Sequence, residues 1–375
     1  MRKTKLALAL LLVAGSAWAR SNHDHAQQQA AGRHVDLVIA LDTSSSMDGL
    51  IDSARQKLWD VVNLLGQARP QPLLRVGLIS YGNDGYDPRT GWTRKEMDLT
   101  TDLDGVYSKL FGLKTNGGTE FVARAVKVAT EQMQWDPSGD ALKIVFVAGN
   151  EPADQDRQFT VDEVVGNARQ KNIFVNTIYC GSPSNGEAIG WQHVAVRGAG
   201  KYAAIDQNKI VAIATPMDNE LQKLSEELNG TYIAYGAGGA GKKENQAAQD
   251  KNAAAASPMA AATRSSAKAK GVYRNDDWDL VDARKHGRVA DMSRMAADEL
   301  PPEMRSMDEK QREQFVEAKS KKRAELQQKI EETSKKRDAF IAEARKKASK
   351  SASPSFDDAL LGAVKTEAQG AGFAF

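Results

Sequence analysis

The chain has 375 residues, with 51 lysines and arginines against 49 aspartates and glutamates, and a single cysteine, Cys180. One cysteine excludes an intramolecular disulfide, so stability has to come from a buried core rather than from a disulfide-stapled small domain. The near balance of charges gives no electrostatic reason to expect a nucleic acid or an anionic membrane as a partner. The length predicts about two domains.

Residues 1–19 have the pattern of a secretory signal peptide. Three basic residues, Arg2, Lys3 and Lys5, precede an apolar run that ends in the A-x-A cleavage site Ala17-Trp18-Ala19. The run is shorter than the about 20 apolar residues that a retained membrane helix needs. We therefore expect cleavage after Ala19, which lowers the formal net charge from +2 to −1. Export is expected, to the periplasm in the first place and to the extracellular space as the alternative, with no integral membrane segment after cleavage.

Residues 20–33 are expected to be a disordered leader, and from residue 34 onward short apolar runs alternate with amphipathic stretches. This alternation predicts an α/β fold, a doubly wound and mainly parallel sheet of six or seven strands with helices on both faces. Ligands of such sheets bind at the carboxyl ends of the strands. The expected strands are 35–41, 73–81, 95–99, 143–148, 173–179, 202–205 and 231–235, and the expected helices are 47–67, 102–113, 121–133, 161–170, 187–196 and 217–228.

The first expected strand ends in Asp42-Thr43-Ser44-Ser45-Ser46, which has the spacing D-x-S-x-S. This spacing places one carboxylate and two hydroxyls on the same turn. All three are hard oxygen donors, which suit magnesium, manganese or calcium better than zinc or copper. Taken alone, the motif has a simpler interpretation, in which Ser44 or Ser46 caps the helix that follows.

A second polar loop, Asn116-Gly117-Gly118-Thr119, lies between two expected helices. Tracing the chain through the expected strands and helices returns this loop to the same edge of the sheet as Asp42. The glycines allow a close approach of the backbone. Thr119 then offers one more hydroxyl at that edge.

Together these motifs resemble those of the von Willebrand factor type A (VWA) family, over about residues 34–236. The family's metal-ion-dependent adhesion site combines D-x-S-x-S, a threonine after paired glycines, and an aspartate after the fourth strand. The resemblance implies that Ser44, Ser46 and Thr119 bind a divalent cation, with Asp42 positioned by hydrogen bonds or a bridging water. Mg²⁺ is the expected ion, and Mn²⁺ or Ca²⁺ are alternatives.

The third loop departs from the family pattern. Where the family commonly reads T-D-G-x-P, this chain reads Ala148-Gly149-Asn150-Glu151-Pro152, so that Gly149 stands in place of the aspartate. The loss of a carboxylate predicts weaker ion binding, and a Gly149→Asp substitution is expected to strengthen it. A domain that keeps the fold without the ion is the alternative. Candidate auxiliary ligands from the same loop are Asn150, Glu151 and Asp154.

Beyond residue 236 the composition shifts to alanine, lysine and glutamate. Residues 237–270 are expected to be a linker with some helix, and 271–306 a segment that docks on the first domain through Trp278, Leu280 and Val281. Residues 307–350 are expected to form one long charged helix and 351–375 a mobile tail, with a short packed helix at 357–364 as the alternative. The apolar stripe of the long helix is thin and consists of Phe315, Leu326, Ile330 and Ile341. Three arrangements are therefore open for this helix: a rod packed against the domain, a coiled coil with another chain, or a single solvated helix.

Three functional classes follow from these features. The favoured one is an exported binding protein whose bound metal captures a protein partner through an aspartate or glutamate carboxylate. The alternative is a scaffold that acts through residues 307–350 and carries a vestigial metal site. A metal-dependent hydrolase is less favoured, since the sequence has no G-x-S-x-G elbow, Walker loop or dinucleotide fingerprint, and a phosphoesterase would need several carboxylates around its metal. The sequence therefore predicts a protein that is not an enzyme.

Overall fold

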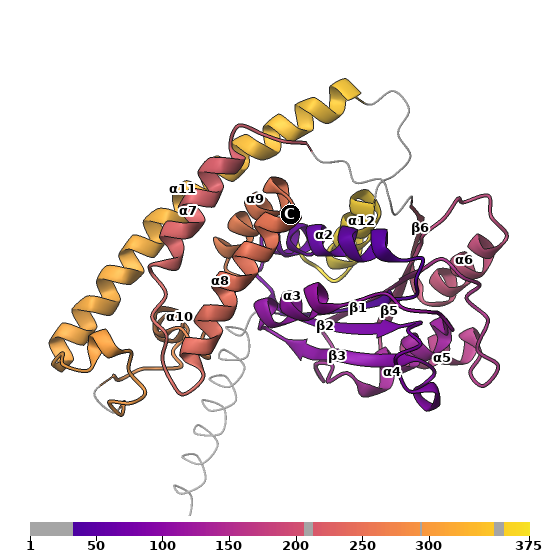
Figure 1. Cartoon of the computed structure of the whole chain (residues 1–375), viewed down its shortest axis with the longest axis horizontal. Coiled ribbons are helices and arrows are strands. Elements are labelled where there is room, and N and C mark those ends of the chain that lie inside the picture. The colour runs from indigo at the N-terminus through magenta and orange to yellow at the C-terminus, as the bar shows by residue number, and fades with distance from the viewer. Residues whose placement is uncertain (1–32, 206–212, 293–294, 349–355) are drawn as a thin grey trace, which may run out of the picture.

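The computed structural model describes residues 33–205, 213–292, 295–348 and 356–375 (Figure 1). The expected signal peptide and nearly all of the expected leader lie outside the described residues.

Six strands form one sheet in the order β3-β2-β1-β4-β5-β6. All neighbouring strands are parallel except β2 and β3, which are antiparallel, so the predicted mainly parallel sheet is confirmed. The strands are β1 (His34–Asp42), β2 (Leu73–Tyr81), β3 (Thr93–Thr100), β4 (Leu142–Gly149), β5 (Ile173–Tyr179) and β6 (Ala199–Ala204).

The prediction of a seventh strand at 231–235 is wrong. This segment forms only an isolated bridge, between Ala234 and Asp279. Its amide groups bond to the chain around Asp279 and not to the sheet: the amide of Ile233 donates to the Asp279 carboxylate at 2.7 Å, and that of Tyr235 to the Trp278 carbonyl at 2.8 Å.

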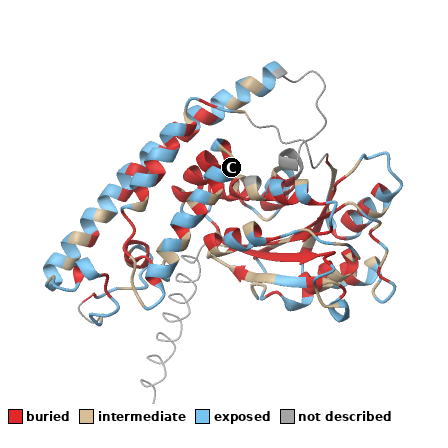
Figure 2. Ribbon diagram, viewed as in Figure 1, coloured by how far each residue is buried: buried red, intermediate tan, exposed pale blue. Residues whose placement is uncertain are grey.

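Helices cover both faces of the sheet (Figures 1 and 2). Side chains of β1 alternate between two apolar clusters, as the two-residue period of a strand requires: Leu37 and Leu41 pack with α2 and α3, whereas Val38 and Ala40 pack with the helices of the other face. The helices are α2 (Asp48–Leu65) and α3 (Leu103–Gly112) on the first face, and α4 (Val122–Gln132), α5 (Val161–Gln170) and α6 (Glu187–Arg197) on the second. A short 3-10 helix, η1 (Pro88–Thr90), precedes β3.

Residues 237–270 do not form a linker. They form α8 (Gly239–Ala256) and α9 (Pro258–Lys268), and every residue of α9 from Met259 to Lys268 is buried. α9 packs against α2, α8 and α7 (Asp218–Asn229). The linker prediction relied on the lack of bulky apolar residues, but small residues such as Ala260 and Ala262 allow a helix to pack closely against its neighbours.

In the segment 271–306, the three residues expected to dock, Trp278, Leu280 and Val281, are buried. Trp278 is buried and stacks on Tyr232, with 5.6 Å between the ring centroids. Leu280 and Val281 belong to a third apolar cluster, which joins α10 (Leu280–Lys285) to the start of the long helix α11. A 3-10 helix, η2 (Pro302–Met304), lies just before α11.

The long charged helix, α11 (Glu309–Ala348), is a rod against the rest of the chain (Figure 1). It packs on α7, α9 and α10, and Leu326 and Ile330 are fully buried there. The expected apolar stripe is therefore used within the chain. Phe315 and Ile341, at its two ends, are half-buried.

In the described part of residues 351–375 the expectation of a mobile tail is wrong, and the structure agrees with the alternative of a packed helix. Residues Phe356–Gly370 form α12, which packs against α2 and β6. Phe373 is buried, and the amide of Arg69 donates to the Ala374 carbonyl at 2.8 Å. The apolar residues of α12, such as Val364, complete the first face of the sheet. In the four described ranges, no helix is both long and apolar enough to span a membrane.

Candidate metal centre

Two loops meet where β1 ends. The amide of Ser45 donates to the Gly117 carbonyl at 2.8 Å, and the amide of Asn116 donates to the Thr43 carbonyl at 3.0 Å. The structure thus joins the D-x-S-x-S turn to the glycine loop, at the edge of the sheet where chain tracing placed both.

The first loop is a tight turn around Asp42, which is fully buried. Its Oδ1 accepts a hydrogen bond from the amide of Ser44 at 2.8 Å, and the hydroxyls of Ser44 and Ser46 lie 3.2 Å apart. Helix α2 starts with Met47 as its cap residue and has no side-chain cap. The structure thus has Met47, and neither Ser44 nor Ser46, at the cap position of this helix.

The second loop brings Thr119 to the same edge. A Cβ atom on Gly118 would lie 2.7 Å from Cβ of Ser44, so a glycine is needed for the two loops to approach. Thr119 follows directly and is half-buried, whereas Ser46 is exposed. Residues that carry side-chain hydroxyls thus come to one edge from two loops.

Of the three auxiliary candidates, the structure brings one to the turn. The Asn150 side-chain amide donates to the Ser46 hydroxyl at 3.2 Å. Glu151 is exposed and accepts a hydrogen bond from the Gln155 side chain at 3.4 Å. Asp154 is exposed, and within the described ranges no hydrogen bond joins it to the Ser44–Ser46 turn.

Glu120, a buried acid beside Asp42, is not among the residues predicted from the sequence. A Cβ atom on Gly82 would lie 2.6 Å from Oδ1 of Asp42 and 2.8 Å from Cγ of Glu120, so both side chains border the same glycine. The Glu120 carboxylate also reaches the glycine loop, because a Cβ on Gly118 would lie 2.6 Å from its Oε1. The available signal was its position, directly after Thr119.

The two acids are electrostatically unusual. Burial raises the pKa of Asp42 well above its ordinary value, and the neighbouring Glu120 raises it further. Burial also raises the pKa of Glu120. Oδ2 of Asp42 and Oε2 of Glu120 are buried without a hydrogen-bond partner. Among the described residues no lysine or arginine forms an ion pair with either, so the edge holds more acceptor oxygens than donors.

Gly149 lies next to Asp42 and leaves no room for a side chain. The Tyr81 hydroxyl donates to the Ala148 carbonyl at 2.9 Å. A Cβ atom on Gly149 would lie 2.6 Å from that hydroxyl and 3.0 Å from Oδ2 of Asp42. The packing therefore gives no support to the expectation that Gly149→Asp restores a ligand, because Tyr81 takes the space that such a residue needs.

The donor set of this edge fits a hard divalent cation. Hydroxyls of Ser44 and Ser46 lie together with two carboxyl groups whose buried oxygens lack donors, and such oxygens are what magnesium, manganese and calcium prefer. In the part of the chain that the structure describes, no group of three or more histidine, cysteine, aspartate or glutamate side chains is placed to hold a metal ion. A site at this edge therefore depends on hydroxyl ligands.

Comparison with protein families agrees with the fold. The model of the von Willebrand factor type A domain matches residues 36–190. The chain contains a VWA domain. No curated protein matches the chain.

Solved structures that resemble the chain share little sequence with it. Proximal thread matrix protein 1 from the mussel byssus, with a zinc occupied MIDAS motif, is 11% identical over 48% of this chain and 43% of that chain, with a TM-score of 0.35. A von Willebrand factor type A protein from Catenulispora acidiphila is 15% identical over 46% and 39%, with a TM-score of 0.36. The SpRpn10 VWA domain is 14% identical over 48% of this chain and 100% of that chain, with a TM-score of 0.36. This chain thus spans less than half the length of the first two structures.

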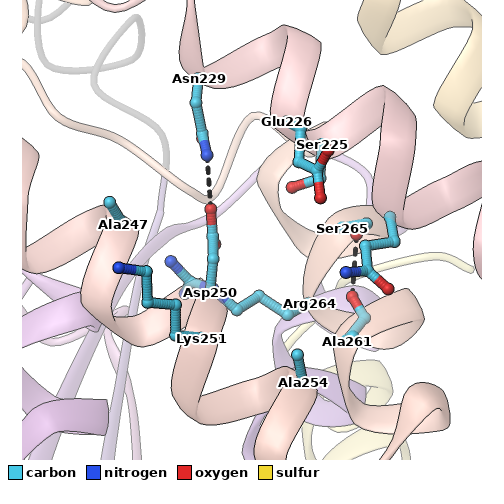
Figure 3. A pocket seen from close by; sticks show the side chains of 11 residues that line it. Ser225, Glu226, Asn229, Ala247, Asp250, Lys251, Ala254, Ala261, Arg264 and Ser265 are labelled. Atoms are coloured by element: carbon cyan, nitrogen blue, oxygen red, sulfur yellow. Dashed lines mark hydrogen bonds and ion pairs between the residues drawn. The ribbon is translucent and has the colours of Figure 1, made fainter.

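A pocket outside the VWA match lies between α7, α8 and α9 (Figure 3). Asp250 accepts hydrogen bonds there from Asn229 and Arg264, both at 2.6 Å, and from Lys268 at 2.9 Å. Burial alone would raise the pKa of Asp250, but Lys268 and Arg264 outweigh it and lower the pKa to about 2. Because these charges already satisfy one another, the pocket is a structural contact between helices.

Proposed function

We propose that this protein binds a divalent cation at the carboxyl edge of its VWA domain and uses it to capture a protein partner. The partner offers an aspartate or glutamate carboxylate. The observation that carries the proposal is the joining of two hydroxyl-bearing loops at the end of β1, through the hydrogen bonds between Ser45 and Gly117 and between Asn116 and Thr43. VWA domains typically mediate protein–protein interactions, which supports the same function.

Ser44, Ser46 and Thr119 would hold the ion, and Asp42 would be positioned by the hydrogen bond from the Ser44 amide. Mg²⁺ is the proposed ion, with Mn²⁺ or Ca²⁺ as alternatives, because hydroxyl and carboxylate oxygens are hard donors. The ion supplies a positive charge at the edge, which attracts a carboxylate from outside. Ser46 is exposed, so a partner can approach this side of the turn.

Export is part of the proposal and is supported by the sequence of residues 1–19, with a basic start, an apolar run and an A-x-A site. The periplasm is the proposed location, and the extracellular space is the alternative.

Action as a scaffold through residues 307–350 has less support. The side chains of α11 that a partner helix would use, Leu326 and Ile330, are buried against the same chain. Arg323 and Arg337 are buried there as well, and they bind Asp279 and Asp218. The large apolar side chain that α11 leaves exposed in its described part is Phe340.

Isothermal titration calorimetry of the full chain with Mg²⁺, Mn²⁺, Ca²⁺ and Zn²⁺ tests ion binding. We expect binding of Mg²⁺ by the wild-type protein and its loss in Ser46→Ala and in Thr119→Ala. Ser45→Ala is the matched control, because Ser45 lies in the same turn at a position that the D-x-S-x-S spacing leaves free. Equal Mg²⁺ affinity in the wild-type protein and in both ligand variants would contradict the proposal.

Partner capture is tested by pull-down from periplasmic extract with the full chain, in Mg²⁺ and in chelator. The expected partner is lost in chelator and in Ser46→Ala, and it is retained by Phe340→Ser on α11. A partner that ignores chelator but is lost with Phe340→Ser would favour the scaffold alternative.

A further inference from the structure

Most buried aspartates and glutamates in this protein form an ion pair with an arginine. The described residues include nine buried aspartates and glutamates. Six of them form ion pairs with an arginine: Asp36 with Arg75, Asp104 with Arg264, Asp156 with Arg124, Asp218 with Arg337, and both Asp279 and Asp282 with Arg323. Such pairing is expected, because an ionised carboxylate is costly to bury alone.

Three buried acids have no arginine partner in the described ranges. Glu367 lies apart from the others and accepts a hydrogen bond from Asn176 at 3.2 Å. Asp42 and Glu120 lie together against Gly82, at the edge of the sheet. A pair of adjacent buried acids without a basic partner therefore occurs at the place where the hydroxyl ligands meet.

Each acid of this pair has one oxygen that is buried without any hydrogen-bond partner, Oδ2 in Asp42 and Oε2 in Glu120. The two side chains are 0% and 5% exposed, so bulk water does not solvate them. Unpaired buried oxygens of this kind are costly. At the other six buried acids an arginine removes that cost, and here a cation from solution would do so.

The place of the missing acid is explained by packing. The family pattern puts an aspartate where this chain has Gly149, and there the Tyr81 hydroxyl leaves no room for a side chain. Glu120 reaches the same edge from the glycine loop, with Oε1 close to Gly118, beside Ser44.

We infer that Glu120 supplies the second carboxylate of the cation site, from the loop after Thr119 in place of the loop after β4. The inference rests on the proposed function, since it needs an ion at this edge. Glu120 would thus provide the negative charge that is lost because Gly149 replaces the family's aspartate. The site would then have two carboxylates, Asp42 and Glu120, one more than the sequence motif alone implies.

The test is Mg²⁺ titration of Glu120→Gln in the full chain. Glutamine has the same shape as glutamate without its charge, so we expect the affinity to fall by at least about tenfold. Glu367→Gln is the matched control, because it removes another buried acid that lacks an arginine, and its affinity should equal that of the wild type. Thermal unfolding gives a second readout: at the same Mg²⁺ concentration, the ion should raise the Tm of the wild type more than that of Glu120→Gln.

The outcomes separate this inference from the proposed function. Absence of Mg²⁺ binding by the wild-type protein would overturn both. Wild-type binding with unchanged affinity in Glu120→Gln would overturn the inference alone, and the two acids would then be a pair that shares a proton. If Glu120→Gln does not fold, Glu120→Asp takes its place: reduced affinity supports the inference, and unchanged affinity overturns it.

Discussion

Buried charge is used in opposite ways in two regions of this molecule. Between the VWA domain and the C-terminal helices lies a charged seam of Asp104, Asp250, Arg264 and Lys268, in which each acid is bound to a base. At the carboxyl edge of the sheet, Asp42 and Glu120 are buried side by side without a base.

This difference separates charges that hold the fold from charges that are open to a ligand. In the seam, α9 brings Arg264 over the ring of Trp59, 4.6 Å from its centroid, and between acids from α3 and α8. Removing one of these residues would leave a buried charge without its ion-pair partner. At the edge, removing one acid would relieve repulsion, and its cost should appear only when an ion binds.

The largest effect is expected in the seam. Arg264→Met keeps an apolar chain of similar length but leaves Asp104 without its ion pair, and Asp250 with Lys268 alone. Breaking a buried pair by removing one partner costs about 3–5 kcal/mol, so the free energy of unfolding in urea should fall by that amount. Arg197→Met is the control, because Arg197 and its partner Asp162 are both exposed, and its effect should stay within about 0.5 kcal/mol. Similar losses in both variants would show that the seam is held by packing alone.

The next effect is a dependence of stability on pH, from Glu367 in α12. Burial raises the pKa of Glu367 from its ordinary 4.5 to about 7, against the opposing effects of Asn176 and Lys201. Between these values the folded state holds a proton that the unfolded state releases, so stability is greatest at or below pH 4.5 and falls as the pH rises to 7. The loss is on the order of 3 kcal/mol, because each pKa unit corresponds to about 1.4 kcal/mol.

Urea unfolding of the wild type and of Glu367→Gln at several pH values checks this. The variant has no proton to release, so its curve should lack the fall between pH 4.5 and 7, and the two proteins should differ most at pH 7 and above. Parallel curves for the two proteins would mean that Glu367 is solvated in the folded state.

A smaller effect is expected at Gly149. An aspartate there has to displace the Tyr81 hydroxyl, and it adds a third acid to Asp42 and Glu120. Overpacking of this kind costs about 1–3 kcal/mol, so metal-free Gly149→Asp should be less stable than the wild type by that amount. Gly139→Asp is the control, since a Cβ atom at Gly139 meets nothing within 4 Å. Stronger Mg²⁺ binding by Gly149→Asp without any loss of stability would restore the expectation drawn from the sequence.

The strands of the sheet could be predicted from the sequence because a strand buried on both faces is a continuous apolar run. The predicted strands at 73–81 and 173–179 match β2 and β5 residue for residue. The segment 231–235 has the same composition but pairs with the chain around Asp279, a contact between distant parts of the sequence that periodicity does not reveal. α9 was missed for a related reason, since its alanines and serines are buried by close packing rather than by size.

At the candidate site, motif spacing predicted that the Asp42 turn and the Asn116–Thr119 loop lie together. It did not predict Glu120, because an acid next to a motif is usually exposed, and only the fold shows that this one is buried. Nor did it explain Gly149, whose neighbour Tyr81 lies at the end of another strand, 68 residues earlier in the chain. Which acid occupies the edge is thus decided by contacts between strands.

The smallest effect on folding is expected at Ser46, and a second serine provides the comparison. Ser266 is buried in α9, where its hydroxyl lies 2.6 Å from that of Ser334 in α11. Ser266→Ala would leave the Ser334 hydroxyl buried without its partner, at a cost of about 1–2 kcal/mol. Ser46 is exposed, so the free energy of unfolding of metal-free Ser46→Ala should lie within about 0.5 kcal/mol of the wild-type value. The order of the two effects should reverse in a Mg²⁺ titration. There Ser266→Ala should bind Mg²⁺ with the wild-type affinity, and Ser46→Ala should not bind it. A loss of stability in metal-free Ser46→Ala as large as that in Ser266→Ala would instead make the Asp42 turn a structural element, with hydroxyls that hold the fold in the way the charged seam does.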